Sequence, residues 1–416
     1  MKMRIFPIVS MILLLNLAFG LPGMAAVAYD RINVTSSPYN AIPNDGLDDT
    51  AAINAAIAAG TSPSRSIYFP PGTYNFIGLM TVPANKSYRF YGDGQGVSTI
   101  LFSTNGSNPT AGINAPNMGT AALNVDGLTL QANSTNCGTA INASFNPGAK
   151  FRTAAIQNVQ IIGSHRDGVS GTYWTNGIYL NKASNTVIDK VHISGNKNVT
   201  QQGISWVAPT NDAATGLEMT NLEVKWCNSA FLTSGHVEGI YVTGFEFISC
   251  GRGGLPAAYI YASQGGGAGE IGGGAVHLMN GQIDSIGNGL SLTNFIFGKV
   301  SNVSFKHTGP ETTDGTMLVM SNVTDVMVTE NSFSGTVSPN AVPNENGVIL
   351  IDAHSVRVAG NNFSNMQPTS NGNCIAVLPA STVVRITDNL FSNVRSQYYV
   401  DGSVPPAEVY FLGNNP

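Results

Sequence analysis

A short phrase that returns ten times between residues 123 and 391 constrains the fold of this chain more than any other feature. Each copy has an apolar anchor, two polar or small residues, a second anchor, one polar residue and a closing anchor, as in residues 125–130 and 188–193. The closing anchors follow one another at intervals of 22 to 36 residues. A period of that length with strand-like alternation inside each unit is typical of solenoids. The repeat therefore predicts an all-β parallel solenoid of about ten or more turns, or rungs.

Stacked rungs lie about 4.8 Å apart, and each pairs its backbone amides with the rungs above and below while the anchors point inward. The last three phrases place Asn331, Asn361 and Asn389 at the second anchor, where earlier copies mostly carry Leu, Val or Phe. Stacked asparagines can hydrogen-bond along a coil and tolerate turn geometry. We therefore expect an internal ladder of asparagines at this corner.

The N-terminus has the pattern of a secretory signal peptide over residues 1–28. Lys2 and Arg4 precede an apolar run and then small residues, which predicts cleavage after Ala28 or, as a second choice, after Ala25. We expect a secreted or periplasmic protein. Loss of the two cations would lower the net charge of −5 by two units, to −7. That balance disfavours nucleic acid and anionic membranes as partners, and no other segment is apolar for long enough to span a bilayer.

Residues 44–60 predict a turn, an Asp cap and a short helix closed by Gly60, which would cover the exposed edge of the first rung. The stretches 45–53, 69–74 and 92–94 resemble the N-terminal signature of the pectate-lyase-like superfamily. This resemblance implies a single-stranded right-handed parallel β-helix with an N-terminal capping helix. It also implies kinship with polysaccharide lyases, glycoside hydrolases, C5-epimerases and tailspike depolymerases. The implied organisation is a signal peptide (1–28), cap and first rungs (29–122), β-helix core (123–395) and a C-terminal cap or tail (396–416).

Two of the four cysteines should share a column. Cys227 and Cys250 each follow a closing anchor by three residues, so their Cα atoms should lie near 5 Å apart on neighbouring rungs, within reach of a disulfide. In an exported chain this spacing predicts a Cys227–Cys250 disulfide, although two reduced thiols stacked in the core also fit it. Cys137 and Cys374 lie too many rungs apart to pair.

Long insertions at residues 163–174, 195–215 and 251–274 predict loops that wall a groove for an extended polymer. Aromatic side chains in and near them would offer flat apolar faces to sugar rings, or alternatively would anchor the loops to the coil. The candidate substrate-binding residues are His165, Arg166, Tyr173, Trp174, Tyr179, Trp206, Trp226, His236, Arg252 and Tyr259.

The polar position before the closing anchor forms an outward column of Gln160, His192, Glu223, Glu246 and Gln282. Glycosidic hydrolysis needs one carboxylic acid and one carboxylate, and Glu223 and Glu246 on adjacent rungs would have the separation of about 5 Å that retaining enzymes use. Stacked like charges would also raise the pKa of one of them. Competing catalytic carboxylates are Asp167, Asp212, Glu238 and Glu270, with His236 or His165 as helpers, and Glu218 is a further candidate.

These residues and the resemblance predict a glycosidase that cleaves a bacterial exopolysaccharide or cell-surface glycan. One alternative is a lyase acting on a uronate polymer, in which His165 and Arg166 with Tyr173, or Arg252 with Tyr259, would serve, although the negative net charge suits a polyanion less well. Another is a non-catalytic carbohydrate-binding β-helix. We predict no cofactor, because the histidines are scattered, but a structural or catalytic Ca²⁺ stays open. For the oligomeric state, analogy with tailspike proteins predicts either a monomer or a homotrimer.

Overall fold

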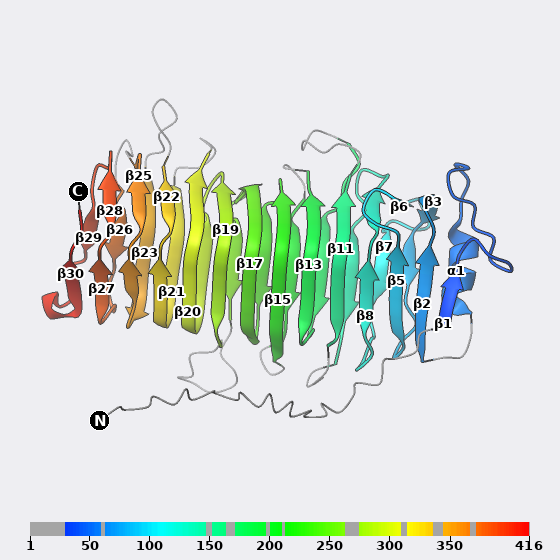
Figure 1. Cartoon of the computed structure of the whole chain (residues 1–416), viewed down its shortest axis with the longest axis horizontal. Coiled ribbons are helices and arrows are strands. Elements are labelled where there is room, and N and C mark those ends of the chain that lie inside the picture. Colours follow the sequence, from blue (N-terminus) through cyan, green and yellow to red (C-terminus); the bar gives the residue numbers. More distant parts are fainter. Residues whose placement is uncertain are drawn as a thin grey trace, which may run out of the picture.

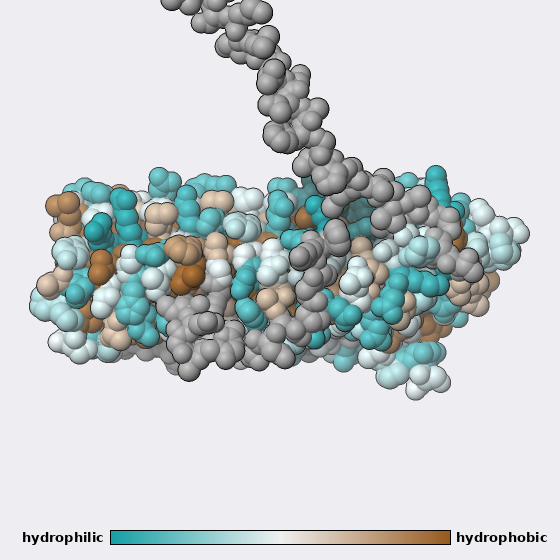
Figure 2. Space-filling model, turned by 90° about the horizontal axis from the view of Figure 1, so that it is seen from below, coloured by the Kyte–Doolittle hydropathy of each residue, from teal (hydrophilic) through white to brown (hydrophobic). Residues whose placement is uncertain are grey.

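The computed structural model describes residues 30–59, 63–146, 152–163, 171–196, 200–209, 213–262, 274–308, 314–335, 344–366 and 372–415. These residues form one right-handed parallel β-helix, seen from the side in Figure 1, whose rungs stack from β1 at the N-terminal end to β30 at the C-terminal end. The predicted fold is confirmed. Seen from below, the rod is largely hydrophilic, with apolar residues scattered among the polar ones (Figure 2).

The strands make three faces. Face 1 contains β1 (Asp30–Asn33), β2 (Ser64–Phe69), β5 (Ser87–Gly92), β8 (Leu123–Asp126), β24 (Arg357–Ala359), β27 (Val384–Thr387) and β30 (Val409–Leu412). Face 2 contains β3 (Gly72–Ile77), β6 (Ser98–Ser103), β9 (Thr129–Ala132), β22 (Ser332–Ser334), β25 (Asn362–Ser364) and β28 (Leu390–Ser392). Face 3 contains β4 (Leu79–Thr81), β7 (Gly112–Ala115), β10 (Thr139–Ser144), β12 (Asn176–Asn181), β14 (Gln202–Val207), β16 (Ser229–Ser234), β18 (Ala258–Tyr261), β23 (Asn344–His354), β26 (Ile375–Val377) and β29 (Tyr398–Val400).

Longer strands run around the corners between faces. Those shared by faces 1 and 2 are β11 (Ala154–Ile162), β13 (Thr186–Ser194), β15 (Ala214–Lys225), β17 (Val237–Cys250) and β19 (Val276–Ser285). Strand β20 (Leu290–His307) contributes to all three faces, and β21 (Asp314–Thr329) to faces 3 and 1. A short 3₁₀ helix, η1 (Pro406–Glu408), precedes β30.

The corner between faces 1 and 2 is made by a single backbone conformation. The third residue of all ten phrases has φ between +52° and +65°, in the left-handed region. The ten residues are Gly127, Asn158, Lys190, Asn221, Gly244, Asn280, Asn302, Glu330, Gly360 and Asp388. Glycine and asparagine enter this region most easily, which explains why they fill seven of the ten positions. One such residue turns the chain from face 1 to face 2 while parallel pairing continues on both sides.

The phrase anchors face inward and form the core, as predicted. Closing anchors stack directly, and the rings of Phe305, Phe333, Phe363 and Phe391 follow one another with centroids 4.8, 4.8 and 5.3 Å apart. The predicted asparagine ladder is also present. Each buried amide donates its Nδ2 hydrogens along the coil, so Asn331 bonds Asn361 Oδ1 at 3.0 Å and Asn361 bonds Asn389 Oδ1 at 3.0 Å.

Helix α1 (Thr50–Ala58) covers the N-terminal end of the coil and buries Ile53, Ala56 and Ile57 against it (Figure 1). Asp49 precedes the helix, but its side chain makes no capping hydrogen bond. Its two carboxylate oxygens instead accept the backbone N–H groups of Ile42 and Asn75, which ties the start of the helix to the first rungs. Gly60, the predicted stop signal, lies outside the described residues. At the other end, β29 and β30 continue the coil beyond residue 395.

The two stacked cysteines are reduced. Cys227 and Cys250 are fully buried free thiols, so the predicted disulfide is absent and the alternative of two stacked thiols holds in this structure. Their mutual contact and then burial raise the pKa of Cys227. Trp226 and Ser249, which directly precede the two cysteines, both have φ in the left-handed region, at 57° and 54°, so the two thiols keep equivalent places on neighbouring rungs.

We expect Asn361→Leu to lower the free energy of unfolding by about 3 kcal/mol, because it leaves the buried Asn331 N–H and amide without their acceptor. Denaturant titration would measure this. The matched control is Asn362→Leu, an exposed neighbour whose partner on the next rung is already Leu390, with an expected change within about 0.5 kcal/mol. Equal losses in both variants would contradict a structural role for the ladder.

Candidate functional site

A groove of about 830 Å³ follows the corner between faces 1 and 2 along the coil axis. Each rung contributes its left-handed corner residue and the polar residue two positions later. These pairs are Asn221 and Glu223, Gly244 and Glu246, Asn280 and Gln282, Asn302 and Ser304, and Glu330 and Ser332. Corner amides join rung to rung, since Asn302 Nδ2 donates to Asn280 Oδ1 at 2.9 Å. The groove thus offers amide donors and acceptors beside a few carboxylates.

Glu223 and Glu246 lie next to each other in this groove. Strands β15 and β17 pair with Glu223 opposite Glu246, and the rest of the predicted column, from Gln160 through His192 to Gln282, is in register with them. Neighbouring strands in a sheet are about 4.8 Å apart. The register that the repeat predicted is therefore confirmed, and it brings two carboxyl groups together in one groove.

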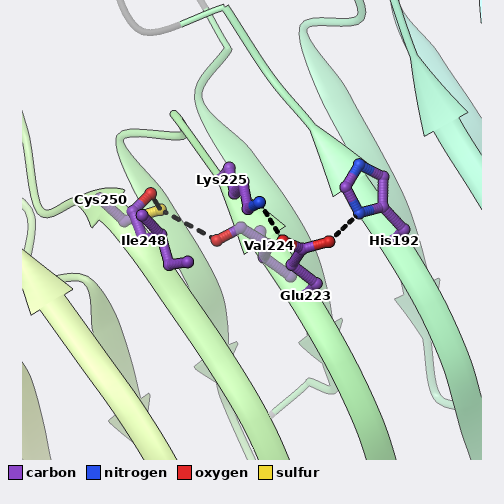
Figure 3. A network of polar contacts seen from close by, with 6 residues as sticks. All are labelled: His192, Glu223, Val224, Lys225, Ile248 and Cys250. Atoms are coloured by element: carbon purple, nitrogen blue, oxygen red, sulfur yellow. Dashed lines mark hydrogen bonds and ion pairs between the residues drawn. The ribbon is translucent and has the colours of Figure 1, made fainter. Parts of the chain in front are cut away.

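Glu223 is held between two basic side chains. One carboxylate oxygen contacts His192 Nδ1 and the other accepts a hydrogen bond from Lys225 Nζ (Figure 3). Partial burial acts to raise the pKa of Glu223, but the Lys225 bond and the nearby His192 outweigh it, so the pKa lies below the ordinary value of 4.5. This is the opposite of the raised pKa that an acid catalyst needs. Glu223 is therefore a fixed, ionised carboxylate.

Glu246 has a different environment. Its side chain is exposed, and it forms no ion pair or side-chain hydrogen bond with another described residue. Glu330, three rungs further along, lines the same groove from a corner position. Neither Glu330 nor Lys225 was among the predicted site residues. Glu330 could have been found from the repeat, because it occupies the third position of its phrase, where the chain bends and the side chain points out of the coil.

A smaller hollow of about 310 Å³ on face 1 adjoins the groove. Its lining includes Thr220, Thr243 and Met279, each of which directly precedes a corner residue of the groove. Glu218 and Tyr241 also line it. The Tyr241 ring meets the His277 ring edge-on with centroids 5.2 Å apart. Burial, and then the charge of Lys299, lowers the pKa of His277.

Two of the predicted sugar-binding tryptophans are core residues. Trp206 is fully buried on β14, and its Nε1–H donates to the Ala183 carbonyl at 2.8 Å. Trp174 is 3% exposed, and its Nε1–H donates to the Ile162 carbonyl at 3.1 Å. The prediction that these rings bind sugar is wrong, because each indole N–H finds a backbone acceptor inside the coil.

The remaining aromatic candidates are dispersed. Tyr179 and Tyr259 point outward from face 3. Two rungs lie between them, which carry Ser205 and Leu232 at the same position. Tyr259 stacks on Tyr261, and burial followed by this neighbour raises its pKa. Partly buried positions are also found for Tyr173 before β12, Trp226 after β15 and Arg252 after β17. None of the five lines the groove.

Glu238 and His236 form a separate pair. Glu238 Oε1 lies 2.8 Å from His236 Nε2. This pair is at the start of β17, whereas Glu246 lies toward the other end of the strand. The structure therefore separates Glu238 from the groove carboxylates. The candidates His165, Arg166, Asp167, Asp212 and Glu270 lie outside the described residues, together with the predicted signal peptide.

Within the part of the chain that the structure describes, no three His, Cys, Asp or Glu side chains gather as metal ligands. In the same residues, no helix has the length and apolarity to cross a membrane.

A family model described as "Rhamnogalacturonase A/epimerase, pectate lyase-like" matches residues 31–255. A comparison with curated proteins gave no match. Among solved structures, the A-module of the Azotobacter vinelandii mannuronan C-5 epimerase AlgE4 superimposes with a TM-score of 0.50 at 16% identity, covering 89% of this chain and 97% of that one. Tailspike protein 3 of bacteriophage CBA120 gives a TM-score of 0.50 at 12% identity, covering 92% of this chain and 61% of that one. These structural similarities concern the fold.

Glu223→Gln should lower the melting temperature at neutral pH, because it removes an ionised partner of Lys225 and His192. The lowered pKa means that this stabilisation is present above the ordinary value of 4.5 and is lost as the pH falls through the folded-state pKa. The difference from wild type should therefore shrink as the pH falls below 4.5. Thermal melts across pH would measure it, with Glu246→Gln as the control that changes little. A difference that stays constant down to acidic pH would contradict this account.

Proposed function

Since the chain belongs to the rhamnogalacturonase A/epimerase, pectate lyase-like family, we propose that it is a glycosidase that cleaves a bacterial exopolysaccharide or cell-surface glycan in the groove between faces 1 and 2. The family description names enzymes of polysaccharides, which supports a glycan substrate. The observation that carries the proposal is the pair Glu223 and Glu246, in register on adjacent rungs and lining one groove.

The two carboxyl groups have distinct environments, which assigns their roles in the proposed reaction. Glu223, kept ionised by Lys225 and His192, attacks the anomeric carbon as the nucleophile. Glu246 donates its proton to the leaving glycosidic oxygen and later takes a proton from the water that releases the sugar from Glu223. A strand spacing of about 4.8 Å is close to the carboxyl separation of about 5–5.5 Å found in retaining enzymes.

The surroundings of the pair suit a polymer. The groove extends over the rungs of β15 to β22, and the amides of Asn221, Asn280 and Asn302 lie along it. Amide groups both donate and accept hydrogen bonds, as sugar hydroxyl groups require. The signal peptide predicted at residues 1–28 agrees with a substrate outside the cytoplasm. Secretion or a periplasmic location, and assembly as a monomer or trimer, remain predictions.

A lyase is the second candidate, and the Tyr241–His277 pair favours it. β-Elimination on a uronate needs a base for the proton at C5 and a cation beside the carboxylate. His277, whose lowered pKa keeps it neutral near pH 7, could act as the base, and Lys299 lies beside it on the next rung. Tyr241 contacts the His277 ring and lines the adjoining hollow. In this scheme the carboxylate pair would bind substrate only.

Incubation of the mature protein with a panel of polysaccharides distinguishes the candidates. Hydrolysis releases reducing ends without a new ultraviolet chromophore, whereas elimination adds the absorbance of a conjugated double bond. We expect reducing ends alone, with the anomeric configuration of the product retained when followed by NMR. Products that carry the chromophore would favour the lyase, and silence in both assays would favour a carbohydrate-binding protein.

Glu246→Gln and Glu223→Gln should each reduce turnover by about 10²-fold or more, because each removes a group that takes part in the bond-breaking step. Glu238→Gln is the matched control on the same strand as Glu246, away from the groove, and should keep activity close to that of wild type. Initial rates of reducing-end release would measure this. Full activity in both groove variants would overturn the site assignment.

The lyase has its own test. Under that mechanism Tyr241→Phe and His277→Asn would abolish elimination while Glu246→Gln would not. Under the proposed hydrolysis we expect both face 1 variants to retain cleavage at a level well above that of Glu246→Gln. The same polysaccharide and the same rate assay serve for all three variants.

A further inference from the structure

The passage from face 1 to face 2 is longer on one rung than on those that follow it. In the ten phrases a single left-handed residue makes the corner, but on the rung of β5 and β6 the chain leaves the coil over residues 93–97. Gly94 and Gly96, with φ of +139° and +74°, supply conformations that residues with a Cβ rarely adopt. We call residues 93–97 the crossing loop. Its path decides how far the corner groove extends toward the N-terminal end.

The crossing loop lies over the corners of the next rungs. The Gly94 N–H donates to the Gly127 carbonyl at 3.0 Å, and at the tip Gln95 Nε2 donates to the Lys190 carbonyl at 2.8 Å. Strands β8 and β11 separate β5 from β13, the strand of Lys190. The loop and the Gln95 side chain together therefore reach across three rung spacings, about 14 Å along the corner line.

Several hydrogen bonds fix the crossing loop in this position. The Tyr68 hydroxyl donates to Asp93 Oδ2 at 2.7 Å, and the Asp93 N–H donates to Ser98 Oγ at 3.0 Å. The Gly96 N–H donates to Thr129 Oγ1 at 2.8 Å, which ties the far side of the loop to the column that leads to Glu223. The loop is thus held to the coil at both ends and at its tip.

Two glycines at the same corner position show how the ends of the corner line differ. A Cβ added at Gly127 would lie 2.7 Å from the carbonyl oxygen of Gly92 and 3.3 Å from the nitrogen of Gly94. A Cβ added at Gly360 would have no described atom within 4 Å. Among the residues that the structure describes, the corner line is therefore covered at its N-terminal end and open toward its C-terminal end.

The carboxylate pair lies next to the covered end. Lys190 is on β13, which pairs directly with β15, the strand of Glu223, so one rung spacing of about 4.8 Å separates the tip contact from this carboxylate. In the other direction the groove continues beyond Glu246 over the rungs of Gln282, Ser304 and Ser332. A glycan in the groove thus has little room on the Glu223 side and much more beyond Glu246.

We propose that the crossing loop makes the enzyme act at chain ends, so that it releases one or two sugars at a time from the non-reducing end of the glycan. This inference rests on the proposed function and adds its mode of action. In that reaction Glu223 bonds to the anomeric carbon and Glu246 protonates the leaving oxygen, so the leaving chain extends toward Ser332. The sugar bonded to Glu223 continues toward the non-reducing end, which is the direction that the crossing loop closes. Gln95 is therefore a specificity-determining residue.

The test uses hexasaccharides prepared from the panel polysaccharide that releases reducing ends, labelled with a fluorophore at the reducing end. We expect the first products to be unlabelled mono- or disaccharides and labelled chains shortened by one or two units. A bulky cap on the terminal non-reducing sugar should slow cleavage about 10²-fold or more, because the capped chain cannot place a glycosidic bond on the carboxylate pair. Equal rates for capped and uncapped chains, or first products of mixed length, would overturn the proposal.

Gln95→Ala shortens the tip of the crossing loop and removes its bond to Lys190. We expect the rate on the capped chain, relative to the uncapped chain, to rise about tenfold or more. The matched control is Val97→Ala in the same loop, where the side chain is 45% exposed, and its rate ratio should stay within about twofold of wild type. Melting temperatures check that both variants fold. An unchanged ratio in Gln95→Ala, or equal changes in both variants, would mean that the crossing loop does not select chain ends.

Failure of this inference and failure of the proposed function give different results. If Glu223 and Glu246 are not catalytic, their Gln variants keep full cleavage activity or no polysaccharide of the panel is cleaved, and both claims fall together. If only the chain-end inference is wrong, the groove variants lose activity while capped and uncapped chains are cut equally fast.

Discussion

Parallel backbone pairing between consecutive rungs is the constraint on which every other feature of this molecule depends. A rung cannot satisfy its own amides, so each one adopts the register of its neighbour, and residues at equivalent places in the phrase line up along the axis. The buried columns of Phe and Asn stabilise the coil from inside. The same register places Glu223 beside Glu246. Backbone geometry therefore fixes where outward side chains stand, and their identities alone decide the chemistry.

Much of this could be predicted from the sequence because the repeat encodes register directly. The closing anchors identified the column of Gln160, His192, Glu223, Glu246 and Gln282, and the structure confirms it. The asparagine ladder was also foreseen, since three asparagines at an anchor position need partners inside the coil. The existence of a plug helix followed from the exposed edge of the first rung. These features depend on spacing, which a sequence shows without ambiguity.

Other parts of the site could not be read in this way. Trp174 and Trp206 were assigned to loops, but both are buried in the coil. Burial is possible because each indole N–H donates to a backbone carbonyl, and no sequence pattern reveals that acceptor. The groove itself arises from the left-handed corner, whose residue types vary from Gly to Lys and Glu, so composition does not mark it. The two cysteines contact each other as their spacing predicted, but spacing does not show whether neighbouring thiols are bonded, and both are free here.

The left-handed corner has an evolutionary consequence. Because the bend depends on one backbone conformation that several residue types can adopt, the side chain at each corner can be exchanged without rebuilding the turn or disturbing the layers on either side. Each rung therefore contributes to the floor of the groove one side chain that can change independently of the others. A lineage with this architecture can therefore change its ligand by successive single replacements, each tolerated by an unchanged scaffold, which gives a physical reason why proteins of such low identity retain the same coil.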